Sequence, residues 1–183
     1  MPSKPKILAE LEESRSAILR YLDAIPEAAW DGAEPGTWSP AQIADHIARV
    51  EEATSTGLHR AESEAGPRRQ LTFRERFMAV PPLAVRIPLL KVDAPSWVRP
   101  EAVPTFEEAK RKLVTARRNL MAYLDSRGEA ELNGLAVRHP FFGWMSAAHA
   151  LRLLVAHDQR HLIQLRRLGE QVAKHPRARA VAA

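Results

Sequence analysis

The sequence carries its strongest helical pattern in residues 150–168, which read ALRLLVAHDQRHLIQLRRL. Apolar residues and histidines recur there every three or four positions, so Leu154, His157, His161 and Leu165 fall on one face of a helix. A face of this composition is buried against other helices, which places two imidazoles inside the protein. The rest of the chain must supply the helices that cover this face.

Three further segments show the same helical period, and together the four segments predict an all-α four-helix bundle. Two of them begin with capping boxes, Ser39-Pro40-Ala41-Gln42 and Thr105-Phe106-Glu107-Glu108, in which side chains satisfy the first backbone N–H groups. Proline or glycine residues are expected to end each helix. The expected helices run from about Lys6 to Ile25, from Ser39 toward Gly66, from Thr105 to Gly128 and from Ser146 to Gly169.

A long connection of about forty residues joins the second and third expected helices. It contains seven prolines between Pro67 and Pro104, and one extra helical turn is expected at Phe73 to Met78. Such a link can cross the end of a bundle and allow the second and third helices to run in the same direction. No segment predicts a sheet, because alternating stretches such as Leu132 to Val137 are too short and isolated.

The composition predicts one globular domain. The chain has 183 residues, 45% of them apolar and only eight of them glycine, which is enough to bury a substantial core. We expect a single domain over residues 1–169 and a basic, frayed tail over residues 170–183. No apolar run reaches the about 18–20 residues of a membrane span, and no apolar signal sequence follows Met1. The expected location is therefore the cytoplasm, without membrane contact.

The chain contains no cysteine, which excludes disulfides, thiolate metal sites and cysteine nucleophiles. The formal charge is +5, and the stretch from Arg160 to Arg179 contains six basic residues and one acidic residue. Cations near the end of a helix are favoured by its dipole. No aromatic side chains are interleaved with these arginines, so the sequence disfavours nucleic acid as a partner.

Three histidines form the candidate site. His157 and His161 lie four residues apart on one helical face, so their two imidazoles can grip one cation. His46 lies between Ile43 and Val50 on the inward face of the second helix. Inward histidines from two helices can converge in a bundle core, and three of them leave coordination positions open for catalysis. The alternative is three core histidines that bond separately to carbonyl or hydroxyl groups.

Other polar and aromatic residues receive smaller roles. Gln164, one turn beyond His161, could orient a metal ligand or the substrate from the second shell. Asp45 and Asp158 are expected to make surface pairs with arginine, because neighbouring helical residues point about 100° apart. Tryptophans of the pocket could be Trp38, Trp97 and Trp144, although ordinary packing is the alternative. The histidines expected to be structural or exposed are His59, His139, His149 and His175.

Three stretches of the sequence, together with its proline-rich link, resemble the DinB/YfiT-like superfamily. They are WSPAQIADHI at residues 38–47, and HPFFGWMS at 139–146 followed by HDQRHLIQ at 157–164. The resemblance extends over about Leu8 to Leu168 and implies a bundle in up-down-down-up order. It also implies a divalent metal, often nickel or zinc, on His46, His157 and His161, and frequent homodimers. Some members are thiol-dependent transferases or isomerases that use bacillithiol, mycothiol or glutathione.

Three functions remain open from the sequence. The first is a metal-dependent enzyme, either a hydrolase or a thiol-dependent transferase, acting on a small molecule with nickel, zinc or copper. A low-molecular-weight thiol would then be a second cofactor. The second is a non-catalytic bundle that binds metal or a small ligand in a stress response. The third is a basic helical protein that binds DNA, whose affinity would depend on salt and survive loss of the histidines.

Overall fold

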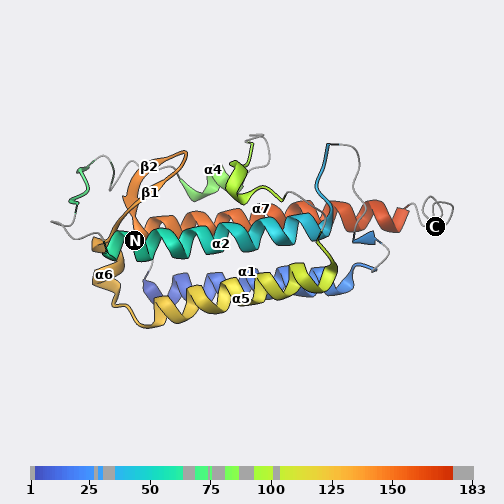
Figure 1. Cartoon of the computed structure of the whole chain (residues 1–183), viewed down its shortest axis with the longest axis horizontal. Coiled ribbons are helices and arrows are strands. Elements are labelled where there is room, and N and C mark those ends of the chain that lie inside the picture. The colour runs from blue at the N-terminus through green and yellow to red at the C-terminus, as the bar shows by residue number, and fades with distance from the viewer. Residues whose placement is uncertain are drawn as a thin grey trace.

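The protein is a four-helix bundle, as the sequence predicts. The computed structural model describes residues 3–26, 29–30, 36–63, 69–73, 75, 81–86, 93–100 and 104–174, with side chains through residue 170. In Figure 1, α1 and α7 run in one direction and α2 and α5 run in the other, which confirms the up-down-down-up order. The four long helices are α1 (Lys4–Ala24), α2 (Pro40–Ser63), α5 (Phe106–Asp125) and α7 (Ala147–Lys174).

The connection between α2 and α5 returns along the bundle, so that these two helices can run in parallel. It includes the short helix α4 (Pro82–Arg86), which packs on α7, and the 3₁₀ helix η2 (Ser96–Val98), which packs on α2. Phe73 and Glu75 are helical, and the other four residues of the extra turn expected at Phe73 to Met78 lie outside the described residues. No helix in the described part of the chain is long and apolar enough to span a bilayer.

Both predicted capping boxes are present. The Ser39 backbone N–H donates to Gln42 Oε1 at 3.0 Å, and the Gln42 N–H donates to Ser39 Oγ at 3.2 Å. Thr105 and Glu108 make the same reciprocal pair at the start of α5. These caps explain why the predicted starts of α2 and α5 are correct to within one residue.

The predicted end of the fourth helix at Gly169 is wrong, because α7 continues to Lys174. Gly169 instead allows a close approach of α1. A Cβ atom at this position would lie 2.5 Å from Tyr21 Oη, and that hydroxyl donates a hydrogen bond to the Arg166 carbonyl at 3.0 Å. Residues 175–183 lie outside the described residues, so the expected division into a domain and a frayed tail stays a prediction.

The prediction that the chain has no strands is also wrong. Strands β1 (Ala136–His139) and β2 (Gly143–Ser146) form an antiparallel hairpin, in which Val137 lies opposite Met145. A short helix, α6 (Glu129–Gly134), leads into the hairpin, and the Ala147 N–H then donates to the Leu135 carbonyl at 2.8 Å. Strands of four residues give too few alternations to be recognised, and packing on α7 stabilises them instead.

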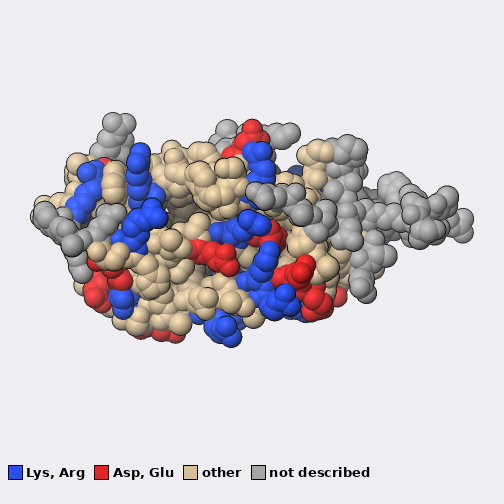
Figure 2. All heavy atoms as spheres, viewed as in Figure 1, with Lys and Arg blue, Asp and Glu red and all other residues tan. Residues whose placement is uncertain are grey.

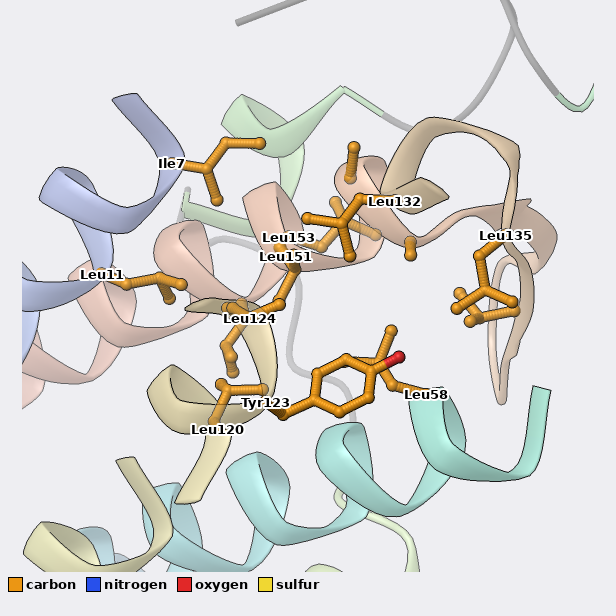
Figure 3. Packing of buried hydrophobic residues seen from close by; sticks show 14 of the residues in the cluster. Ile7, Leu11, Leu58, Leu120, Tyr123, Leu124, Leu132, Leu135, Leu151 and Leu153 are labelled. Atoms are coloured by element: carbon orange, nitrogen blue, oxygen red, sulfur yellow. The ribbon is translucent and has the colours of Figure 1, made fainter. Parts of the chain in front are cut away.

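Two apolar clusters fill the bundle, one at each end. The cluster beside the hairpin includes Leu11, Leu120, Leu124 and Leu151, and Figure 3 shows these side chains converging from three helices. The second cluster is built around Ile18, Ile47, Leu113 and Leu165. Each fully buried leucine or isoleucine contributes roughly 1.5–3 kcal/mol of transfer free energy, so these clusters supply most of the folding energy.

A polar layer lies between the two apolar clusters. Each long helix contributes one buried polar residue, at a sequence position between its residues in the two clusters: Ser14, Glu51, Arg117 and Asp158. The Arg117 guanidinium is bonded to Glu51, to the Leu11 carbonyl and, at 2.7 Å, to Asp158 Oδ2. Ser14 Oγ donates to the same Asp158 oxygen at 2.7 Å. This layer therefore joins all four helices at one level of the bundle.

Candidate metal centre

The fold brings the three predicted histidines together. His46 comes from α2, and His157 and His161 come from consecutive turns of α7, which packs against α2. His157 Nε2 lies 3.2 Å from His46 Nε2 and 3.1 Å from His161 Nε2. Their ligand atoms all lie within 4.8 Å of one another, in a group that could hold a metal ion.

The opposite ring nitrogens of two of the histidines are fixed by hydrogen bonds. His46 Nδ1 donates to the Val98 carbonyl at 2.7 Å, at the end of η2. His161 Nδ1 lies 2.7 Å from Gln164 Oε1 and donates to it. A proton held at Nδ1 leaves the Nε2 lone pair available to a cation, and such outer partners also set the orientation of the ring. Gln164 thus contacts the His161 ring on the side opposite to Nε2.

Burial keeps the three imidazoles neutral at neutral pH. It is the main cause that lowers the pKa of His46, of His157 and of His161, the last to about 3. The pKa of His157 is lowered further because His161 and His46 lie beside it. A metal ion binds the neutral imidazole and not the imidazolium. Near neutral pH these side chains can therefore bind a metal ion without first losing a proton.

The two separations that involve His157 Nε2 fit a single first-row divalent ion. Ligand nitrogens about 2.0–2.1 Å from an ion, at angles between octahedral and tetrahedral, lie about 2.9–3.4 Å apart. The observed separations of 3.1 and 3.2 Å fall within this range. Three neutral imidazoles that point their Nε2 atoms at one place need a proton or a cation between them. The chemistry and geometry of the donor set therefore fit a metal.

A cavity of about 1420 Å³ opens beside the three histidines. Its walls come from α2, α4, α7, the β1–β2 hairpin and residues 93–99. Trp38 lies 4.7 Å from the His46 ring, centroid to centroid, and Trp97 also lines the cavity. Trp144 is not among the described lining residues, and instead lies 4.6 Å beneath the Arg69 guanidinium. Two of the three tryptophans named from the sequence therefore face the cavity.

The other described histidines do not belong to the group of three, although His139 lines the same cavity. His59 packs on Tyr123 with ring centroids 4.6 Å apart, and His149 is half-buried in the first turn of α7. His139 stacks on Phe142 at the hairpin tip and lines the cavity, where burial lowers its pKa to about 4. His175 lies outside the described residues.

The two aspartates are not at the surface, which corrects the sequence prediction. Asp158 is 0% exposed and belongs to the polar layer with Arg117. Asp45 is 2% exposed and accepts hydrogen bonds from Arg49 and Lys112, each at 2.7 Å, so its pKa is lowered despite the opposing effect of burial. The basic partners were expected, and the burial of both carboxylates was not.

The fold and the site define a class of protein: a helical bundle with an inward-facing cluster of three histidines beside a cavity. The sequence model of the DinB superfamily matches residues 10–165, and the chain belongs to that superfamily. Among solved structures, it is similar to TT2238, described as a four-helix bundle protein, with a TM-score of 0.59 and 23% identity over 90% of this chain and 99% of that one. No protein with a curated description matches the chain.

Proposed function

We propose that the protein is a metal-dependent enzyme, either a hydrolase or a thiol-dependent transferase, with His46, His157 and His161 as the metal ligands. The observation that carries this proposal is the convergence of three neutral imidazoles beside a cavity large enough for a small-molecule substrate. A site with three protein ligands is typical of catalytic metals, because it leaves positions open to substrate. Nickel and zinc suit imidazole nitrogen ligands.

A bound divalent ion would supply Lewis acidity and lower the pKa of a water or thiol that it binds. The chain's own residues prepare the site for it. The Val98 carbonyl and Gln164 hold the Nδ1 protons of His46 and His161, so both rings present their lone pairs inward. Trp38 packs against His46 and shields it from water. The thiol, a homodimer and the cytoplasmic location stay predictions of the sequence.

Elemental analysis of protein purified without a histidine tag tests the metal assignment. We expect about one equivalent of nickel or zinc in the wild type and a large loss in the variant His157→Ala. His59→Ala is the matched control, because His59 lies on α2 outside the site and should leave the metal content unchanged. Equal, substoichiometric metal in all three proteins would contradict the assignment.

A screen of small thiols against generic electrophiles and esters then tests the enzymatic part of the proposal. We expect turnover by the metal-loaded wild type and by His59→Ala, and none by His157→Ala. A metal-loaded protein that turns over nothing, and whose metal neither exchanges ligands with thiols nor binds added anions, would favour a non-catalytic binding protein.

A further inference from the structure

The walls of the cavity carry a strong excess of positive charge. Among the described residues that line it, five are arginines and a single one, Asp93, is acidic. These arginines come from α2, the end of η2, β1 and α7: Arg60, Arg99, Arg138, Arg160 and Arg167. By contrast, Figure 2 shows basic and acidic side chains lying next to one another over the face formed by α2 and α5. The cavity wall therefore differs in charge from the face formed by α2 and α5.

Two of the arginines share a helical face with the metal-binding histidines. Arg160 and Arg167 lie seven residues apart on α7, and His157, His161 and Gln164 line the cavity from the same face. Arg160 is close enough to His157 and His161 for its charge to lower the pKa of both. Its guanidinium is half-buried and reaches across toward α4, where Nη1 donates to the Val85 carbonyl at 3.4 Å.

Among the described residues, the other arginines of the cavity have no acidic partner. Within the described ranges, Arg60, Arg99, Arg138 and Arg167 form no ion pair with a carboxylate. Arg99 Nη2 donates to the Ala94 carbonyl at 3.0 Å. Uncompensated cations in a concave site with low-dielectric walls concentrate the electric field and attract anions. Guanidinium groups also match the geometry of carboxylate and phosphate oxygens.

Much of the remaining wall is apolar. The buried side chains of Leu58, Val137, Leu153 and Leu154 line the cavity, and Phe141 and Phe142 stand at the hairpin tip. A small inorganic anion would leave most of this surface without a partner. The composition instead suits a molecule with an apolar body and one anionic group.

We propose that the cavity binds an apolar organic anion, whose carboxylate or phosphate group is held by Arg160 and Arg167 beside the three histidines. If the protein is the proposed metalloenzyme, this anion is its substrate class. Only the role of the anion as a substrate rests on the proposed function. Anion binding itself needs the arginines and the apolar wall, and it should therefore occur in metal-free protein.

Fluorescence titration with two matched probes tests the inference in chelator-treated and zinc-loaded protein. The anionic probe is 8-anilinonaphthalene-1-sulfonate, and the uncharged probe is N-phenyl-1-naphthylamine. We expect Arg160→Met and Arg167→Met to weaken binding of the anionic probe about tenfold or more, and to leave the uncharged probe unaffected. Arg118→Met is the matched control, because it removes the same charge from the exposed face of α5. Arg167 is exposed, so its variant stays informative should Arg160→Met fail to fold.

Competition with benzoate, phenyl phosphate and benzyl alcohol then identifies the anionic group. If benzoate displaces the sulfonate probe at a lower concentration than phenyl phosphate does, the site prefers a carboxylate, and the reverse order indicates a phosphate. Benzyl alcohol should displace the probe poorly. The inference is overturned if both arginine variants bind the sulfonate like the wild type, or if the alcohol competes as well as the anions.

Metal analysis of the same proteins separates this inference from the proposed function. Arg160→Met should retain the metal, because it removes a repulsive charge near the site and none of the ligands. Metal binding without arginine-dependent anion binding would refute the anion site alone. Arginine-dependent anion binding without metal in the wild type would refute the metalloenzyme alone.

Discussion

Replacement of Arg117 by methionine should destabilise the bundle strongly. The substitution keeps an apolar stem of similar length and removes a guanidinium that is 0% exposed. That group binds Glu51 on α2, Asp158 on α7 and the Leu11 carbonyl on α1. Without it, two carboxylates that are also 0% exposed lose the guanidinium with which both form an ion pair.

The size of the effect follows from the burial of the layer. Removing one partner of a fully buried ion pair costs about 3–5 kcal/mol, because the remaining charge is left uncompensated. The whole free energy of unfolding of a domain is about 5–15 kcal/mol. The variant should therefore lose at least about a fifth of its stability at pH 7.

The loss should shrink at lower pH. Burial already raises the pKa of Glu51 to about 7 and raises that of Asp158, even with Arg117 present. Without the guanidinium both pKa values rise further, so the folded variant takes up protons that relieve the charge. By linkage, a group that binds protons more tightly when folded gains stability as the pH falls. We expect the deficit relative to the wild type to be smaller at pH 5 than at pH 7.

Urea unfolding followed by circular dichroism at both pH values measures the deficit. Arg118→Met, on the exposed side of α5, should stay within about 0.5 kcal/mol of the wild type. A variant with Glu51, Arg117 and Asp158 all replaced by apolar residues should recover most of the lost stability. The reasoning is refuted if Arg117→Met matches the wild type at pH 7, or if its deficit is unchanged at pH 5.

Three further predictions concern the metal-free protein, the packing of α1 on α7 and the site. Metal-free protein should lose stability as the pH falls from about 6.5 toward 3, because the pKa values of the three histidines are lowered in the folded state and the unfolded chain binds more protons. The raised pKa of Glu51 has the opposite effect, since its protonation stabilises the folded state as the pH falls. Urea titrations should therefore show a steeper loss of stability for Glu51→Gln. Gly169→Ala should cost about 1–3 kcal/mol because its Cβ would lie 2.5 Å from Tyr21 Oη, whereas Gly57→Ala, which meets no atom within 4 Å, should not destabilise. Gln164→Leu should weaken metal binding about 10–100-fold in calorimetric titration without changing the unfolding curve, and unchanged affinity would deny Gln164 its role.

The sequence predicts the features that depend on local pattern. Helical period and the two capping boxes identify the long helices, and the spacing of His157 and His161 places them on one face. The contact of this pair with His46 depends on how α2 and α7 pack, which no local pattern specifies. Only the resemblance to the DinB/YfiT-like superfamily implies that the three histidines share one ion.

The sequence predicts less well where tertiary contacts decide the structure. The Val98 carbonyl that accepts from His46 belongs to the proline-rich connection, whose path no period encodes. The buried layer was missed although a signal existed: Arg117 lies four residues after Leu113 and three before Leu120, on the apolar stripe of its helix. A charge on such a stripe predicts a buried partner. The sequence predicts that Gly169 ends the fourth helix, and this is wrong. The close approach of Tyr21, on α1, cannot be predicted from the residues next to Gly169 in the sequence.

Diffraction from crystals soaked with zinc, recorded at the zinc absorption edge, tests the metal site most directly. The account predicts one strong anomalous peak within bonding distance, about 2.0–2.1 Å, of Nε2 of His46, His157 and His161 together. A peak bonded to fewer than three of these nitrogens, or zinc found only elsewhere on the protein, would contradict it.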